Sequence, residues 1–211
     1  MRMALRMLAA ACLLATAGQA AEAGEGAAPR LPDRLLAPIS ADRIDEVKFS
    51  EAVLIYSNAA RRAHGLPPLA ADGRLTNAAV GHAQNMARLR IHSHILPVRG
   101  QADLKQRIDR QSVQYRTAGE NIAMNKVYRL VGRPIAIGGQ GCSFTYGDTR
   151  QPVPIHSYAT LAEDAVDRWL ASPKHRASLL SPVFRRLGSG VGVDPGGTAC
   201  GDVYLVQDFA D

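Results

Sequence analysis

Apolar residues recur at helical spacing most clearly between residues 74 and 90. Asp72 is positioned to cap the start of this predicted helix, and the apolar positions fall on one face. That face consists of Leu75, Ala79, His82, Ala83, Met86 and Leu89. Its histidine is predicted to be a core residue with a hydrogen-bond partner, because buried polar groups are nearly always bonded.

Two further segments, 42–64 and 102–111, show a weaker helical periodicity. Gly65, followed closely by two prolines, ends the first of these predicted helices. The residues expected to face inward are Ile44, Val47, Leu54 and Ile55 in the first helix and Leu104 and Ile108 in the second.

A fourth helix is predicted for residues 160–171. Thr160 and Glu163 have the spacing of a capping box, in which each side chain bonds the other residue's backbone amide. The residues expected to be buried are Ala162, Ala165, Val166, Trp169 and Leu170. Ser172 then caps a fifth helix with Pro173 at its first position, which places His175 in the first turn.

Two strands are predicted near the C-terminus, at 187–193 and 202–209. The turn residues Asp194-Pro195-Gly196-Gly197 between them favour an antiparallel hairpin. By contrast, glycines and prolines interrupt residues 124–158 throughout. We interpret this segment as a long irregular insertion with room for one hairpin, and loops of such length are usually functional or mobile.

The first 23 residues have the features of a secretory signal peptide. Arg2 and Arg6 precede an uncharged apolar run at 7–17, and small residues follow it. The run is too short to span a bilayer and no later stretch is long enough, so no transmembrane segment is expected in the mature chain. Cys12 fits a lipoprotein signal poorly, because the residue three positions before it is alanine.

Residues 24–40 are rich in alanine, glycine and proline and are predicted to form a flexible N-terminal strap. Residues 41–211 then make a single domain of ordinary size. Of the 211 residues, 46% are hydrophobic and 21% charged, which is typical of a globular rather than a disordered chain. The net charge is +6, but the arginines are spread along the chain, which disfavours nucleic-acid binding and predicts a solvated surface.

An exported chain enters an oxidising compartment, periplasmic or extracellular, where cysteines pair by default. Once Cys12 has left with the signal peptide, Cys142 and Cys200 remain. Both lie in glycine-rich, loop-like sequence, so a disulfide is predicted rather than two buried thiols. The bond would close a long loop and contribute about 4 kcal/mol in the chain-entropy model.

A series of short motifs runs through the chain in a recognisable order. They include Gly65-Leu66-Pro67-Pro68-Leu69, His82-Ala83, Ser93-His94, Gly119-Glu120-Asn121-Ile122-Ala123, Trp169 to Arg176, Gly190-Val191-Gly192 and Val206-Gln207-Asp208-Phe209. The series resembles the CAP superfamily (cysteine-rich secretory, antigen 5 and pathogenesis-related proteins), also called the SCP domain, and within it the bacterial secreted branch. The resemblance covers about residues 45–209. It implies an α+β fold, a three-layer αβα sandwich with a small, mostly antiparallel sheet between helices.

The resemblance also implies a cleft lined by two histidines and two acidic residues that can bind a divalent metal such as zinc. By motif, His94, Glu120 and His175 are the expected metal ligands, and Asn121 lies in the same cleft. The second acidic residue departs from the family pattern. Ser172 occupies the position where many members have glutamate, and Asp167 and Glu163 are the nearby acids.

Three functions remain open at this stage. The leading hypothesis is a monomeric, non-enzymatic module that binds a lipid or sterol, a cell-wall polymer or a protein. The alternative is a metal-dependent or Ser/His hydrolase of peptide or cell-wall bonds, with His94, Glu120 and His175 as catalytic residues and Ser93 as a possible nucleophile. The third is a structural envelope module in which the cleft is vestigial.

Overall fold

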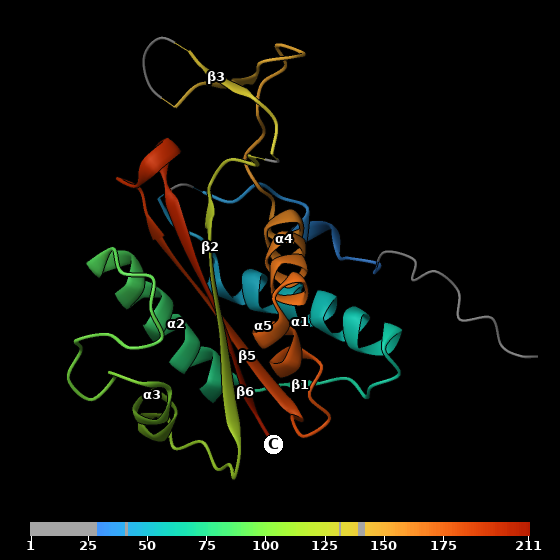
Figure 1. The fold of residues 1–211 in the computed structure, drawn as a ribbon, viewed down its shortest axis with the longest axis vertical. Coiled ribbons are helices and arrows are strands. Elements are labelled where there is room, and N and C mark those ends of the chain that lie inside the picture. The colour runs from blue at the N-terminus through green and yellow to red at the C-terminus, as the bar shows by residue number, and fades with distance from the viewer. Residues whose placement is uncertain (1–28, 41, 131, 139–141) are drawn as a thin grey trace, which may run out of the picture.

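A computed structural model describes residues 29–40, 42–130, 132–138 and 142–211. They form three layers, with a four-stranded sheet between helices α2 and α3 on one face and α1, α4 and α5 on the other (Figure 1). The predicted α+β sandwich is therefore confirmed. The predicted signal peptide, with Cys12, and the first residues of the strap lie outside the described residues.

The helices begin at residues that cap them. Asp45 caps α1 (Glu46–Ala63), and its carboxylate accepts hydrogen bonds from the next free amides. Asp72 caps α2 (Gly73–Leu89), as predicted. The remaining helices are α3 (Leu104–Arg110), α4 (Tyr158–Ala171) and α5 (Pro173–Leu179). All five predicted helices are present, with shifted ends.

Two details of the helix prediction are wrong. Val47 does not face the core, because α1 starts after Ile44 and the helical phase is set by Phe49 and Val53, which are buried. The capping box of α4 joins Ser157 and Thr160 and does not involve Glu163. The helix begins at Tyr158, so Thr160 is already inside its first turn.

The sheet has the order β1-β5-β6-β2. β5 (Arg186–Asp194) and β6 (Asp202–Ala210) form the predicted antiparallel hairpin. β2 (Ala118–Lys126) pairs antiparallel with β6 at one edge, and the short β1 (Ala70–Ala71) pairs parallel with β5 at the other. The sequence pattern does not predict β2, because it carries buried polar side chains and therefore lacks an apolar alternation.

β5 has a glycine at every second position facing α2. A Cβ atom at Gly188, Gly190 or Gly192 would lie 2.1–2.3 Å from the nearest atoms of α2, all of them backbone. Such distances are impossible for real atoms, so only glycine allows the helix backbone to lie directly on the strand.

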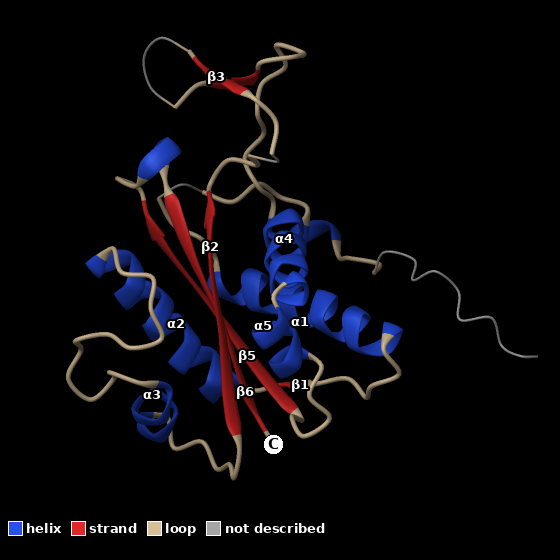
Figure 2. Cartoon of the chain, in the orientation of Figure 1, coloured by secondary structure: helices blue, strands red, loops and turns tan. Residues whose placement is uncertain are grey.

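The insertion starts later than predicted, because β2 continues to Lys126. Residues 127–157 leave and rejoin the sandwich at neighbouring points, where the His156 amide donates to the Val127 carbonyl at 3.0 Å. The excursion carries a two-stranded sheet, β3 (Ile135–Ile137) and β4 (Phe144–Tyr146), which stands beyond the end of the sandwich (Figure 2).

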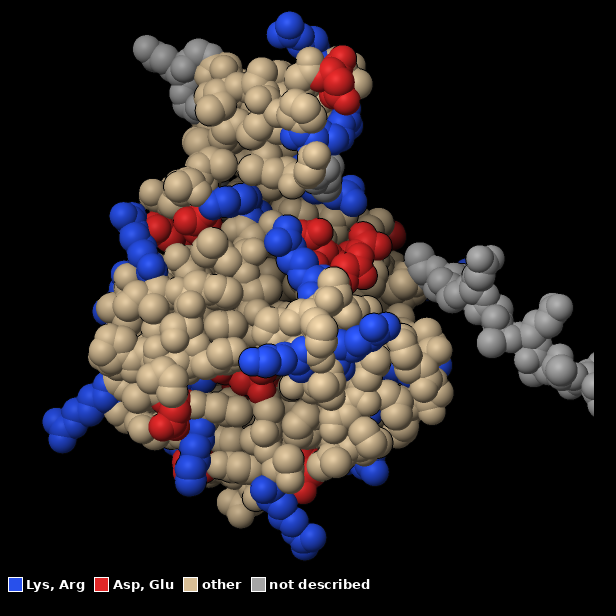
Figure 3. All heavy atoms as spheres, viewed as in Figure 1, with Lys and Arg blue, Asp and Glu red and all other residues tan. Residues whose placement is uncertain are grey.

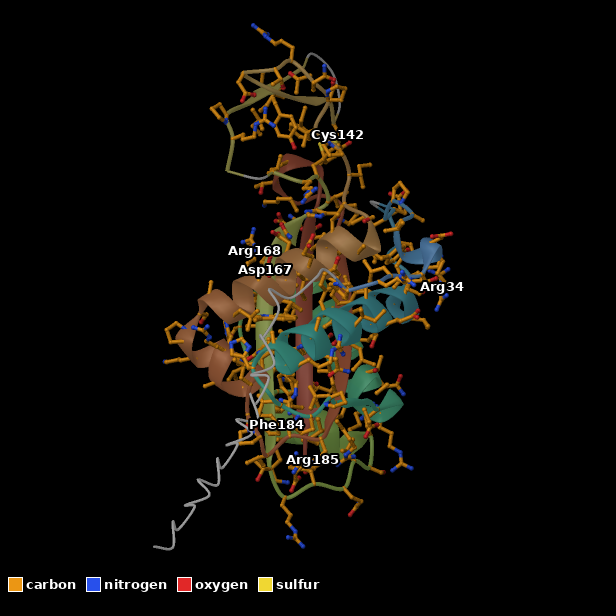
Figure 4. The ribbon with its side chains drawn as sticks, turned by 90° about the vertical axis from the view of Figure 1, so that its right-hand side faces the viewer. Arg34, Cys142, Asp167, Arg168, Phe184 and Arg185 are labelled. Carbon is orange, nitrogen blue, oxygen red and sulfur yellow. A yellow bond between two sulfur atoms is a disulfide. The ribbon has the colours of Figure 1, made fainter. Side chains whose placement is uncertain are left out.

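The predicted disulfide between Cys142 and Cys200 is confirmed, with the two Cα atoms 5.6 Å apart. It joins the excursion to the segment between β5 and β6 and lies close to the projecting end of the molecule, where Figure 4 labels Cys142.

Trp169 is fully buried in the main core, as predicted. Two residues of the strap, Leu35 and Ile39, are buried in the same core, and the Ile39 amide donates to the His156 carbonyl at 2.8 Å. The described part of the strap is thus packed against the domain, whereas the sequence predicts a flexible strap.

Lysine and arginine side chains are spread over the face shown in Figure 3 and do not gather in one patch. This distribution agrees with the predicted solvated surface. Within the described ranges, no helix combines the length and apolar character needed to cross a membrane.

Candidate functional site

β2 is an edge strand, and its side chains alternate between the two faces of the sheet. Glu120 pairs with Asp208 of β6 and contacts residues of α2 and α3. Asn121 pairs with Gln207 and contacts α5 on the opposite face. The neighbouring residues of the Gly-Glu-Asn motif therefore serve two different layers.

Glu120 is the centre of a buried charged cluster, and its side chain is only 4% exposed. One carboxylate oxygen accepts a hydrogen bond from His94 Nδ1 at 2.7 Å, and the other accepts from Arg107 Nη2 at 2.6 Å. Burial alone would raise the pKa of Glu120. The hydrogen bond from His94 and the charge of Arg107 outweigh burial, so the pKa lies below its ordinary value. Glu120 is therefore an anion with both oxygens engaged.

Arg107 is missed by the sequence analysis, although it is fully buried. Besides Glu120, it bonds the carbonyl oxygens of His94, Gln101 and Ala102 through Nη1. It thereby fixes the loop that carries His94 against α3. Arg107 lies three residues after Leu104 and one before Ile108, on the inward face of the helix. This position is the sequence signal that could have identified it.

Asp208 is the second acidic residue of the cluster. It is fully buried and faces Glu120 across the β2–β6 pair. Burial raises the pKa of Asp208 well above its ordinary range, and the negative charge of Glu120 raises it further. Both influences favour the neutral carboxyl, and neither of its oxygens has a hydrogen-bond partner among the described residues. Asp208 lies two residues from each of the buried residues Val206 and Ala210, so the three side chains are on the same face of the strand. This spacing is the sequence signal that points to Asp208.

His82 is buried as predicted, but it has no hydrogen-bond partner among the described residues. Its Nε2 lies 3.7 Å from the Glu120 oxygen that Arg107 already occupies. Burial lowers the pKa of His82 to about 4, although the charge of Glu120 opposes the shift. The predicted core position of this histidine is confirmed, and the Ser93 backbone is the hydrogen-bonding group near enough to raise its pKa slightly against the effect of burial.

Asn121 organises the other face of β2. Its Nδ2 donates to the His175 carbonyl and to Gln207 Oε1, both at 3.1 Å. Gln207 in turn donates to Ser57 of α1 at 2.8 Å. This buried chain ties α1 and α5 to the sheet, so Asn121 positions the helix that carries His175.

Three histidines surround the outer edge of β2. His94 is 51% exposed, and His175 is half-buried on α5. Burial lowers the pKa of His175, and the nearby His94 adds to the effect. The pKa of His92 is lowered by burial and then by both other imidazoles. The three rings therefore lie within electrostatic range of one another, although no three His, Cys, Asp or Glu of the described part are arranged to hold a metal ion.

Two predicted cleft residues lie outside this cluster. Ser172 caps α5 by position, but its side chain makes no capping hydrogen bond. Asp167 is exposed on α4 beside Arg168 (Figure 4), and partial burial and Asp164 raise its pKa. In the described ranges neither side chain bonds Glu120 or His94.

A pocket of about 570 Å³ opens between α3 and β2. Its apolar wall consists of Ile95, Leu104, Ile108, Tyr115 and Ala118, and its polar wall includes His94 and Glu120. A polar groove of about 670 Å³ between α1, α2 and β5 contains none of the cluster residues. The pocket beside His94 is therefore the cavity that the cluster can serve.

The family model of CAP, the cysteine-rich secretory protein family, matches residues 54–209. The chain belongs to the CAP family. The matched range contains the whole Glu120 cluster and both cysteines of the disulfide.

The CAP domain is 30% identical over 139 residues to the "Uncharacterized membrane protein YlbC" of Bacillus subtilis (strain 168), a match that covers 66% of this chain and 30% of that protein. It is similar to an extracellular SCP-domain protein of Bacillus anthracis, with 25% identity and a TM-score of 0.52 over 87% of this chain and 45% of that one. An outer surface protein of Borrelia burgdorferi shares the fold, with 18% identity and a TM-score of 0.51 over 79% of this chain and 96% of that one. This chain thus spans less than half of the first two proteins.

The CAP domain does not assemble the Ser/His arrangement that a hydrolase of the predicted type would use. Ser93 Oγ accepts a hydrogen bond from the Ile95 amide at 3.2 Å, which holds it within its own loop. His94 directs Nδ1 at Glu120 instead. The described geometry therefore offers a positioned imidazole without a nucleophile bonded to it.

Proposed function

We propose that this CAP domain is an exported, non-enzymatic module that binds a small ligand with an apolar body in the pocket between α3 and β2. The observation that carries the proposal is a mainly apolar pocket bordered by the Glu120 carboxylate, whose two oxygens are already bonded by His94 and Arg107. Glu120 is paired with Arg107 and bonded by His94. An apolar ligand would therefore not have to remove water from an unpaired charge, which would be costly.

His94 determines the chemistry of the ligand's polar end. The Glu120 carboxylate can only accept hydrogen bonds, so His94 Nδ1 must carry the hydrogen. In the neutral form of that tautomer, Nε2 is a hydrogen-bond acceptor, and the half-exposed ring lines the pocket. A hydroxyl group is its natural partner. Within the predicted ligand classes, an alcohol-bearing lipid or sterol therefore fits better than a cell-wall polymer, which needs an extended groove.

Calorimetric titration with 1-decanol, beside decanoic acid, tests this proposal. We expect saturable binding of the alcohol that Leu104→Gln weakens by about tenfold, because the substitution places an amide in the apolar wall. Leu36→Gln is the matched control, since Leu36 is exposed on the strap and lies outside the pocket. Equal binding by both variants would contradict the pocket assignment. Cleavage of casein or peptidoglycan that is lost in His94→Ala/Glu120→Gln would instead favour the hydrolase.

A second candidate function is zinc binding by His94 and His175. A carboxylate that bonds one nitrogen of a histidine commonly orients the other nitrogen toward a metal, and Glu120 has this relation to His94. Glu120 itself suits direct coordination poorly, because a divalent cation would then lie beside the Arg107 guanidinium. When bound by two imidazoles and water, zinc would supply a Lewis acid at the edge of β2.

Calorimetry with zinc and metal-stripped protein tests this second function. We expect about one equivalent to bind and both His94→Ala and His175→Ala to abolish binding. His64→Ala is the control, because His64 is exposed at the end of α1 and bonds only the Ala60 carbonyl. Glu120→Gln should weaken binding by about 10- to 100-fold if the carboxylate orients His94. Binding that persists in either of the first two variants would exclude a shared site.

A further inference from the structure

The excursion of residues 127–157 contains a small folded unit with its own buried residues. These are Phe144, Tyr146 and Val153, packed with the partly buried Tyr128 and Leu130. The disulfide ties the unit to the segment between β5 and β6. Figure 1 shows β3 standing clear of the sandwich. An isolated two-stranded sheet is only marginally stable. The contacts along each of its edges therefore show whether a further strand could add to it.

The outer edge of β4 is covered by the returning chain. The Tyr146 amide donates to the Gln151 carbonyl, and the Val153 amide donates to the Phe144 carbonyl, both at 2.9 Å. β4 is therefore bonded on both sides, to β3 and to residues 151–153.

The outer edge of β3 has no strand paired with it among the described residues. Gly147 donates to the Pro134 carbonyl and Gly138 to the Ser143 carbonyl, both at 2.8 Å, so residues 134, 136 and 138 direct their backbone groups at β4. The alternation of an antiparallel ladder then turns the backbone groups of Ile135 and Ile137 outward. Outside the ladder, no backbone hydrogen bond of the described residues uses either isoleucine.

The side chains of these isoleucines extend the apolar face of the small sheet. Ile135 lies opposite Tyr146 and Ile137 opposite Phe144, so all four share one face. Both aromatic residues are buried, whereas Ile137 is 75% exposed at the margin of the cluster. A further strand beside β3 would bond the free backbone groups and cover Ile137 together.

The charge of the excursion indicates which strand would fit. Its charged residues are Arg129, Arg133, Arg150 and Asp148, so the unit is positive overall. Arg133 is paired with Asp148 at 2.6 Å, which leaves Arg129 and Arg150 as the remaining cations. Two copies of this chain that met edge to edge would bring like charges together. A partner segment with acidic residues would be attracted instead.

We propose that β3 is a docking edge for an extended, acidic segment of another protein, which adds a third strand to the β3–β4 sheet. Ile135 and Ile137 supply the backbone hydrogen bonds, Ile137 supplies the apolar contact, and Arg129 and Arg150 select for acidic residues. This surface is separate from the pocket at His94, so the proposal does not depend on the ligand proposed above.

Fluorescence anisotropy with a labelled peptide tests the proposal on the mature chain with its disulfide intact. The probe alternates valine and threonine and has glutamates at both ends. Ile137→Pro removes an outward amide without removing a β3–β4 hydrogen bond, and Ile137→Thr removes the apolar contact but keeps the amide. Val47→Thr is the matched control, since Val47 is 77% exposed on α1.

We expect Ile137→Pro to weaken binding by about tenfold or more, Ile137→Thr by severalfold, and Val47→Thr to have no effect. The same peptide with lysines in place of glutamates should bind about tenfold more weakly. The proposal is overturned if wild type does not bind, if Ile137→Pro binds normally with an unchanged circular dichroism spectrum, or if the lysine peptide binds equally well. A dimer that Ile137→Pro abolishes would also overturn it, because the occupant would be a second copy.

Discussion

Among the described residues of this CAP domain, two arginines are fully buried, and they have different surroundings. Arg61 of α1 bonds backbone carbonyl oxygens, whereas Arg107 of α3 bonds carbonyl oxygens and a carboxylate. The carbonyl partners of Arg61 are those of Pro67, Leu179 and Ser181 at 2.9 Å and of Phe184 at 3.5 Å. The first arginine thus fastens the end of α1 to the segment after α5.

Arg61 is a charge with a structural role, whereas Arg107 belongs to a candidate site. The acceptors around Arg61 are neutral and do not titrate. Around Arg107 lie four groups that do, namely His82, His94, Glu120 and Asp208. Clusters of titratable groups with shifted pKa values are typical of functional sites, although structural networks can produce them too. Variants of the two regions should therefore behave differently.

The largest effect is expected for Arg107→Met. It leaves the Glu120 anion buried without its cation, so the free energy of unfolding should fall by about 4 kcal/mol. Adding Glu120→Gln removes the stranded charge and should restore much of the loss. Urea unfolding of both single variants and the double variant measures this coupling. Strictly additive losses would show that the pair does not act as a unit.

Arg61→Met should lower the free energy of unfolding by about 3 kcal/mol, since several charge-assisted hydrogen bonds disappear and the carbonyls lose their donor. Here Glu120→Gln should bring no recovery, because the two residues share no partner. The affinities for decanol and zinc should also stay unchanged when measured by calorimetry on folded protein. Recovery by Glu120→Gln would mean that the two regions are coupled.

Stability should decrease in acid. Burial lowers the pKa values of His82 and His156 to about 4, while both histidines have pKa values near 6.5 when unfolded. The unfolded chain therefore binds protons first, and stability falls between about pH 6.5 and pH 4 and is unaffected by these groups above that range. Each histidine should account for about 2 kcal/mol at pH 5.

Urea unfolding of His82→Gln and His156→Gln between pH 7.5 and pH 4 measures how much of the slope of stability against pH each histidine causes. His156 is the matched residue outside the cluster, where it bonds Thr160. We expect both variants to flatten the slope, and only His82→Gln to alter zinc or decanol binding. A slope unchanged in both would place the acid sensitivity elsewhere.

The smallest effect is expected for Asp208→Asn. The raised pKa means that the neutral carboxyl is favoured in the folded state, and stability linked to it is lost as pH rises through that pKa. Asparagine imitates the neutral form, so the variant should be within about 1 kcal/mol of wild type at pH 7 or more stable. Thermal unfolding at pH 7 and pH 4 measures the difference. A severe loss at pH 7 would show that the charged form is required.

The parts of the fold that could be predicted have local signals. Asp72 and a clear apolar periodicity predict α2. The Asp-Pro-Gly-Gly turn predicts the hairpin, and the cysteines in loop-like sequence predict the disulfide. β2 could not be predicted, because Glu120 and Asn121 place polar groups on both of its faces and remove the alternation that identifies a strand.

The site was predictable where a motif marks it and not where pairing between distant strands creates it. His94 and Glu120 were identified and are bonded to each other. Sequence proximity to His175 favours Asp167 and Glu163 as the second acid. Asp208 is brought to Glu120 by the register of β2 and β6, which no local spacing reveals.

The glycines of β5 affect how precisely α2 is positioned over the sheet that carries the Glu120 cluster. Elsewhere in the domain the gap between helix and sheet is filled by side chains, which can repack and change the gap by fractions of an ångström. Where α2 lies on Gly188, Gly190 and Gly192, backbone touches backbone, and no rotamer can adjust the separation. The height of the α2 backbone above β5 is thereby set by main-chain contacts, and substitutions of side chains around His82 should leave that separation unchanged.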